Sequence, residues 1–125
     1  MKRGDIYLVN FKKKYHDEFG KVRPALIFQT DILNEHIDRL PFKTVAVIPL
    51  STQVLGGHFR VMVDQRDHLE NQSEVVVNWI CTLDYSLIYK EKLLTRLTDE
   101  ELREVEDKLM LFLGYKDNIV ISALG

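Results

Sequence analysis

The chain has 125 residues, 46% of them hydrophobic, with 17 lysines and arginines against 19 aspartates and glutamates. That length suits one domain with a single modest core, and the mixed composition argues against a wholly disordered chain. The formal net charge of -2 argues against a protein that is basic throughout, as a nucleic-acid coat would be, but it leaves room for a local basic site.

Cysteine content and hydropathy indicate the compartment. Cys81 is the single cysteine, so an internal disulfide and a zinc cluster are both excluded, which fits a reducing cytosol. No signal-peptide pattern follows Lys2 and Arg3, and no stretch approaches the roughly 20 apolar residues of a membrane span. We therefore expect a cytoplasmic protein with no membrane partner.

Two strands are predicted near the N-terminus. Alternating residues predict a strand over 5–10, and the short apolar run that begins at Pro24 predicts a buried strand over 24–30. The polar loop between them, residues 12–20, holds three consecutive lysines. It is either a solvated hairpin tip or a mobile arm that collects a polyanion.

The middle of the chain predicts further strands. Residues 31–40 predict a short helix or irregular excursion that Asp31 could cap. The β-branched segment 43–50 predicts a third strand, in which Pro49 favours an edge position or a bulge. Gly56 and Gly57 mark a turn. The predictions that follow are a fourth strand over 58–64, a fifth over 74–82 and short extended pieces over 83–97, with Leu93 and Leu94 buried.

A helix is the clearest local signal. Thr98 and Glu101 form a capping box, and Gly114 is suited to the residue after the helix. Apolar residues recur on one face between them, at Leu102, Val105, Leu109, Phe112 and Leu113. The apolar segment 118–122 is either a last strand or an interface element. Five or six short strands followed by one helix predict a mainly β fold, a small and strongly bent antiparallel barrel or sheet with the helix against it.

Few side chains suggest chemistry. Nucleotide-binding and metalloprotease motifs are absent, the four histidines share no ligand spacing, and Cys81 lies in an apolar run typical of a small buried hydrophobe. Arg23 stands where the second strand begins, and Ser51 and Thr52 stand where the third ends. If these strands pair antiparallel, the guanidinium and the hydroxyls meet at one end of the sheet, a combination suited to a phosphodiester.

At these residues the sequence resembles the MazF/PemK family of toxins from bacterial toxin–antitoxin pairs, from about Lys2 to Gly114. The matching elements are Arg3-Gly4-Asp5-Ile6-Tyr7, Glu18 with Gly20 and Val22-Arg23-Pro24, Gln29-Thr30-Asp31 with Asn34, Ile48-Pro49-Leu50-Ser51-Thr52-Gln53, and Thr82-Leu83-Asp84.

The resemblance implies a fold and an activity. The fold is an SH3-like antiparallel barrel with a C-terminal helix, forming a homodimer; we expect one such domain over 1–125, with 115–125 as an extension beyond the family pattern. The activity is that of an endoribonuclease that needs no metal or other cofactor and cuts single-stranded RNA at short sequences. The ribose 2′-hydroxyl attacks the phosphate, which leaves a 2′,3′-cyclic phosphate and a 5′-hydroxyl. An acidic cognate antitoxin is the expected partner.

The resemblance also assigns roles to residues. Arg23 matches the family's catalytic arginine and Ser51 its catalytic threonine. Because arginine is a poor general base, we expect Arg23 to stabilise transition-state charge and Ser51 to hydrogen-bond a phosphate oxygen. Candidate acid–base or loop groups are His16, Asp17, Glu18 and His58, and candidate RNA contacts are Lys12, Lys13, Lys14, Lys21, Thr52, Gln53 and Asn78.

Some positions depart from the family pattern. Val76 and Asn78 stand in the fifth strand where some members carry an arginine and an acid, and Cys81 stands where an arginine often precedes the T-I-D element. Asp17 replaces a histidine of some members, with His16 one residue earlier. The general acid and base therefore stay open.

Two alternatives remain open at this point. One is a non-enzymatic toxin of the same fold, similar to the CcdB gyrase poisons, although the ending Ala123-Leu124-Gly125 lacks their Trp-Gly-Ile. The other is a catalytically weakened relative that binds RNA, motivated by Val76 and Asn78.

Overall fold

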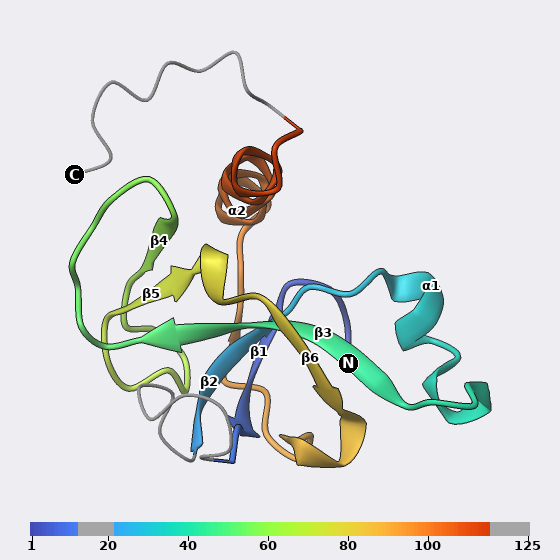
Figure 1. Ribbon diagram of the computed structural model, residues 1–125. Coiled ribbons are helices and arrows are strands. Elements are labelled where there is room, and N and C mark those ends of the chain that lie inside the picture. The colour runs from blue at the N-terminus through green and yellow to red at the C-terminus, as the bar shows by residue number, and fades with distance from the viewer. Residues whose placement is uncertain (13–21, 116–125) are drawn as a thin grey trace.

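A computed structural model describes residues 1–12 and 22–115 of the chain, and within them a curved antiparallel sheet packs against one long helix (Figure 1). The strands are β1 (Asp5–Asn10), β2 (Val22–Ile27), β3 (Thr44–Ser51), β4 (Arg60–Val63), β5 (Ser73–Val76), β6 (Cys81–Asp84), β7 (Ile88–Tyr89) and β8 (Thr95–Arg96). The helices are α1 (Asp31–Asn34) and α2 (Asp99–Phe112), with short 3-10 turns η2 (Ile37–Arg39), η3 (Val77–Trp79) and η4 (Tyr85–Leu87). The mainly β fold with a C-terminal helix is confirmed.

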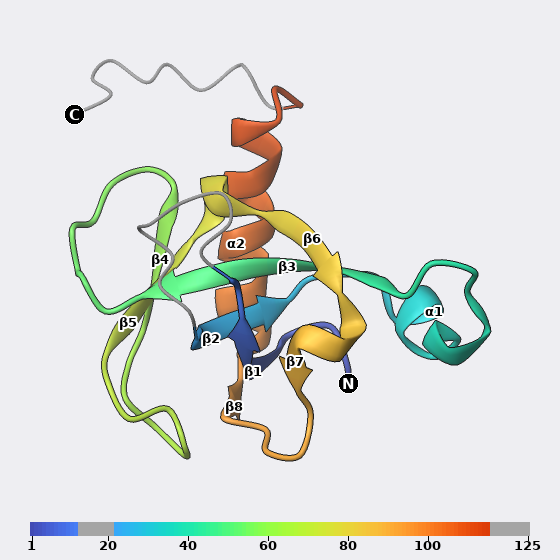
Figure 2. The same cartoon turned by 60° about the horizontal axis from the view of Figure 1, so that its bottom comes forward.

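The sheet curls without closing into a ring. Its hydrogen-bonded order is β4-β5-β3-β2-β1-β7, while β6 pairs with β3 and β8 pairs with β1. Figure 2 shows the curvature, with β6 leading down from β3 toward β7. Antiparallel pairing places the start of β2 and the end of β3 at the same end of the sheet.

β3 is the central strand, and it changes partner along one edge. Its first half pairs with β6 as far as Val47 opposite Cys81, and its end pairs with β5 from Leu50 opposite Val75. Pro49 falls in the gap between these two pairings, where the strand needs no backbone donor. The prediction was an edge position or a bulge, and the edge position is wrong because β3 has partner strands on both sides. The break between the β6 and β5 pairings still spares Pro49 a hydrogen bond that it could not donate.

The predicted fifth strand, 74–82, is two strands. β5 ends at Val76, the 3-10 turn η3 intervenes, and β6 begins at Cys81. Both strands pair with the same edge of β3, so the turn carries the chain around the bend of the sheet. A continuous apolar run cannot reveal such a break, because each half looks like buried strand.

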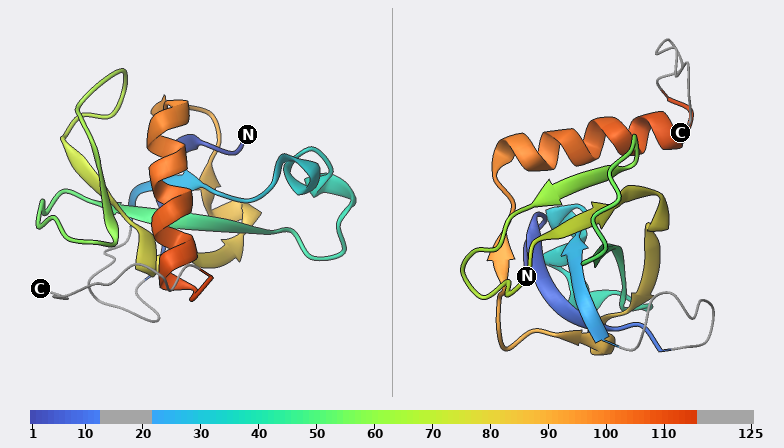
Figure 3. Two further views of the ribbon diagram at one scale, coloured as in Figure 1. Left: turned by 90° about the horizontal axis from the view of Figure 1, so that it is seen from above. Right: turned by 90° about the vertical axis from the view of Figure 1, so that its left-hand side faces the viewer.

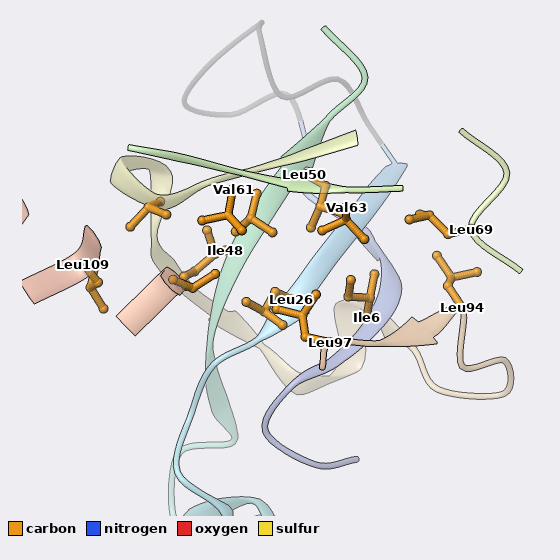
Figure 4. Packing of buried hydrophobic residues seen from close by; sticks show 13 residues of the cluster. Ile6, Leu26, Ile48, Leu50, Val61, Val63, Leu69, Leu94, Leu97 and Leu109 are labelled. Atoms are coloured by element: carbon orange, nitrogen blue, oxygen red, sulfur yellow. The ribbon is translucent and has the colours of Figure 1, made fainter. Parts of the chain in front are cut away.

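Two hydrophobic cores lie on opposite faces of β1, β2 and β3. The helix-side core lies between the sheet and α2, and Figure 4 shows Leu50, Val61 and Val63 gathered in it. Its members are Ile6, Leu26, Ile48, Leu50, Val61, Val63, Leu69, Val75, Val77, Leu94, Leu97, Val105 and Leu109. The far-side core consists of Tyr7, Val9, Ala25, Ile27, Ile37, Val45, Val47 and Ile88. The alternation of β1 follows from this arrangement, with Ile6 in one core and Val9 in the other.

Helix α2 begins as the capping box predicts. The Thr98 hydroxyl accepts from the Glu101 backbone N–H, and the Glu101 carboxylate accepts from the Thr98 N–H. Figure 3 shows the helix lying across one side of the sheet beside β4. Val105 and Leu109 are buried against the sheet, but Leu113, predicted on the same face, is 52% exposed. The reason is that α2 ends at Phe112 and Gly114 takes a positive φ of 83°, so the apolar face ends there.

Smaller corrections concern element ends. β2 runs over Val22–Ile27 instead of 24–30, because pairing with β1 extends it toward the loop. α1 is capped by the Thr30 hydroxyl, which accepts from the Ile32 N–H, and not by Asp31. Leu94 is buried and Leu93 half-buried, as predicted. The predicted element at 118–122 lies outside the described residues. Among residues 1–12 and 22–115, no helix is long and apolar enough to cross a membrane.

Candidate active site

Arg23 and Ser51 lie at the same end of two paired strands, as the antiparallel hypothesis requires. β2 and β3 pair from Ile27 opposite Val47 to Ala25 opposite Pro49, and Arg23 and Ser51 each lie two residues beyond that last pair, at the same end. Side chains alternate between faces along a strand, so Arg23 projects to the face of Ala25 and Ser51 to the face of Pro49, which is the same face of the sheet. The guanidinium and the hydroxyl therefore share one face at the mouth of the β2–β3 pair.

Arg23 is partly buried, which affects both its pKa and its interaction with anions. Its strand partner in β1 is Val9, which is fully buried in the far-side core. The guanidinium is half-buried beside this core, and the burial lowers the pKa of Arg23 below its ordinary value. Arginine still stays charged at neutral pH. A cation held partly out of water interacts more strongly with an anion than one in bulk solvent.

Ser51 is oriented by its own loop. Its Oγ accepts a hydrogen bond from the Gln53 N–H at 3.1 Å. That bond uses an oxygen lone pair, so the hydroxyl proton can still be donated to another group. Ser51 is only half-buried, which leaves it accessible to a ligand.

A buried ion pair next to Ser51 was missed by the sequence reasoning. Ser51 is paired with Glu74 of β5, whose side chain is 3% exposed. Arg60 of β4 donates from Nη1 to Glu74 Oε1 at 3.0 Å and to the Gln53 carbonyl oxygen at 2.9 Å. An isolated acid at the start of an otherwise apolar run, Glu74-Val-Val-Val, was the available signal.

The carboxylate of Glu74 also holds the backbone of the loop. Oε1 accepts from the Leu55 N–H at 2.8 Å, and Oε2 accepts from the Gly56 N–H at 3.0 Å. Burial raises the pKa of Glu74, but the bonds from Leu55, Arg60 and Gly56 outweigh it, so the pKa lies below its ordinary value. Glu74 is therefore held in its charged form.

A cavity of about 340 Å³ brings together two of the predicted residues, His58 and Asn78. The guanidinium of Arg60 lies over the Trp79 ring, with its carbon 5.8 Å from the ring centre. The lining residues are Gly56, Gly57, His58, Phe59, Arg60, Val76, Asn78 and Trp79. The cavity thus offers an aromatic surface, an amide and an imidazole, which are the groups that bind unpaired bases.

Thr52 is separated from that cavity. It lines a second hollow, of about 260 Å³, together with Leu8, Pro24 and His68. Gln53 is exposed, and its backbone links the Arg60 and Ser51 contacts described above. The predicted RNA contacts therefore fall on both sides of the Ser51 loop instead of in one pocket.

Of the remaining predicted residues, which belong to the segment between β1 and β2, only Lys12 is among the described residues. Lys12 is exposed, and its N–H donates to Asn10 Oδ1 at 3.1 Å. The other predicted loop residues, Lys13, Lys14, His16, Asp17, Glu18 and Lys21, lie outside the described residues. Cys81 is half-buried against the far-side core, and burial raises the pKa of its thiol, which fits the packing role predicted for it. Within the described part of the chain, no group of three His, Cys, Asp or Glu residues could hold a metal ion.

Comparisons with known proteins show the family of this chain. Residues 2–113 match the family described as PemK-like, MazF-like toxin of type II toxin-antitoxin system. The Endoribonuclease MazF of Staphylococcus saprophyticus is 30% identical over 117 residues, covering 91% of this chain and 92% of that protein.

Solved structures share the fold. The Mycobacterium tuberculosis toxin MazF-mt6 matches with a TM-score of 0.70 at 19% identity, covering 88% of this chain and 96% of that one. A mycobacterial endoribonuclease in complex with its cognate antitoxin matches with a TM-score of 0.71 at 20% identity, covering 93% and 97%. MazF from Deinococcus radiodurans matches with a TM-score of 0.70 at 21% identity, covering 91% and 96%. With the family pattern matched over nearly the whole chain, this protein belongs to the PemK-like, MazF-like toxins of type II toxin–antitoxin systems.

Proposed function

We propose that this protein is the toxin of a toxin–antitoxin pair and acts as a sequence-specific endoribonuclease on single-stranded RNA without a metal ion. The observation that carries the proposal is the antiparallel β2–β3 pairing, because it brings the start of β2, with Arg23, and the end of β3, with Ser51, to the same end of the sheet. A relative named Endoribonuclease MazF, 30% identical over nearly the full length, supports the same reaction class.

In the proposed reaction the RNA supplies its own nucleophile. The 2′-oxygen bonds to phosphorus, the bond from phosphorus to the 5′-oxygen breaks, and the products carry a 2′,3′-cyclic phosphate and a 5′-hydroxyl. The 2′-proton goes to a general base, and the leaving 5′-oxygen receives a proton from a general acid.

Each residue then has a defined task. Arg23 stabilises the extra negative charge on the pentacoordinate phosphorus group through a two-pronged hydrogen bond, and Ser51 donates to one of the phosphate oxygens. Among the residues that the structure describes, His58 is the candidate for proton transfer, and it lines the 340 Å³ cavity together with Asn78. His16, Asp17 and Glu18 are the candidates on the loop before β2.

Substrate and partners follow from the charge pattern. Lys12, Lys13, Lys14 and Lys21 attract the RNA backbone locally although the chain is acidic overall, and Thr52, Gln53 and Asn78 contact nucleotides. We further propose that the protein forms a homodimer in the cytoplasm. An acidic antitoxin would compete for the same surface, and a mycobacterial endoribonuclease of similar fold has been solved in complex with its cognate antitoxin.

The test is incubation of purified protein with a 5′-labelled single-stranded RNA in the presence of EDTA. We expect fragments that end in a cyclic phosphate, with the corresponding duplex RNA left intact as the control. Loss of cleavage on adding EDTA would overturn the metal-independent mechanism. Tight binding without any cleavage would instead identify a catalytically weakened RNA-binding relative.

A further inference from the structure

We propose that the buried Arg60–Glu74 ion pair is a positioning device that holds the Ser51–Gly57 loop, and with it the Ser51 hydroxyl, in the geometry for phosphate binding. The proposal rests on the function proposed above and extends it to two residues that the family resemblance did not indicate.

A continuous series of hydrogen bonds runs from the ion pair to Ser51. Glu74 Oε1 and Oε2 bind the N–H groups of Leu55 and Gly56. Arg60 Nη1 bridges Glu74 and the Gln53 carbonyl oxygen, and the Gln53 N–H in turn donates to Ser51 Oγ. Backbone groups of Gln53, Leu55 and Gly56 are thus all tied directly to one buried pair.

The strand register determines where the ion pair lies relative to Ser51. Glu74 lies opposite Ser51 on the neighbouring strand β5, and Arg60 lies opposite Val76 on β4, one strand further out, so both side chains project to the face that carries Ser51. The side chains are 14% and 3% exposed, so water competes little for their hydrogen bonds. Holding a loop by charged, buried hydrogen bonds limits how far Ser51 can move relative to Arg23.

A hydrophobic pair would fill the same space, so the charges call for an explanation. Buried ion pairs often add no net stability over apolar residues of similar volume. Here the carboxylate has two oxygens facing two backbone donors, which no apolar side chain could satisfy. Misplacement of a catalytic group by about 1 Å can cost on the order of a hundredfold in rate. Precise placement of the loop is therefore a sufficient reason for the pair.

The experiment compares Glu74→Gln with the double variant Glu74→Gln/Arg60→Met. Glutamine has one acceptor oxygen and a donor nitrogen, so at least one of the Leu55 and Gly56 N–H groups loses its acceptor. The double variant removes both charges, so no unpaired ion is left to unfold the protein. The matched control is Glu101→Gln, which disrupts a half-buried pair with Arg66 that lies away from the loop.

Amide hydrogen exchange and cleavage kinetics are measured on each variant. We expect exchange at Leu55 and Gly56 to speed up at least about tenfold in both Glu74 variants, with unchanged exchange in β2 and β3. We also expect kcat on RNA to fall roughly ten- to a hundredfold, with KM changed less than about threefold. Glu101→Gln should leave both quantities as in the wild type.

Faster exchange throughout the sheet, or equal losses of kcat in Glu101→Gln, would reduce the pair to a general stabilising role and overturn the proposal. So would unchanged exchange at Leu55 and Gly56. If the wild type left RNA intact, the proposed function would be wrong, and so would a role of the ion pair in catalysis. The exchange data would still decide whether the ion pair holds the loop.

Discussion

Replacing Arg23 should separate catalysis from stability. In Arg23→Met a chain of similar length remains beside the far-side core, but the charge and the two-pronged hydrogen bond are lost. Removing one preorganised donor from an enzyme site costs about 2.7–4 kcal/mol, so kcat should fall roughly a hundred- to a thousandfold. Ser51→Ala removes a hydrogen bond to a charged phosphate, worth about 1.5–3 kcal/mol, which corresponds to roughly a ten- to 150-fold loss.

The stability of the same variant is measured beside its activity. Burial lowers the pKa of Arg23, which means that the folded environment disfavours its charge. The urea midpoint of Arg23→Met is compared with that of the wild type, so that a loss of activity is separated from a loss of folding. Arg39→Met is the control, because Arg39 is exposed in η2, which precedes β3 and so lies at the opposite end of that strand from Ser51.

The assay is single-turnover cleavage of a labelled RNA in EDTA, with Arg23→Lys and the double variant Arg23→Met/Ser51→Ala included. Lysine keeps the charge but not the planar fork, so its rate should lie between those of arginine and methionine. If both residues contact one phosphoryl group, the double variant should lose less than the product of the single losses. Activity of Arg23→Met within about threefold of the wild type would refute the assignment, as would an equal loss in Arg39→Met.

Three further predictions concern stability and binding. Leu109→Ala, at a site 8% exposed between α2 and the sheet, should cost about 2–5 kcal/mol of unfolding free energy in urea titrations; a loss below about 1 kcal/mol would contradict the packing. The folded pKa of Glu74 is lowered, so its ionised form contributes stability that is present above the unfolded pKa of about 4.3 and is lost as pH falls through the folded pKa. Thermal melts of Glu74→Gln should therefore depend less on pH below about 4.3 than those of the wild type, and parallel curves would contradict this. RNA affinity should weaken with salt, and Lys12→Ala should reduce the log–log slope by about 0.7; an unchanged slope would remove Lys12 from the interface.

Local rules were sufficient for several parts of the molecule. The Thr98–Glu101 capping box and the β1 strand at Asp5–Asn10 were predicted with their observed ends. The capping box acts between residues three apart, and the period of two in β1 reflects the two cores on its faces. The convergence of Arg23 and Ser51 also followed from the sequence, because antiparallel pairing alone brings the start of one strand to the end of the next.

Tertiary structure decided what depends on distant partners. The run 74–82 carries no local sign of its break, because η3 exists to let β5 and β6 follow one bent edge of β3. Arg60 and Glu74 are 14 residues apart and become an ion pair only through the β4–β5 pairing. A lone glutamate in an apolar run indicates that a buried carboxylate needs a partner. Only the packed sheet determines which cation pairs with it and which loop the two residues hold.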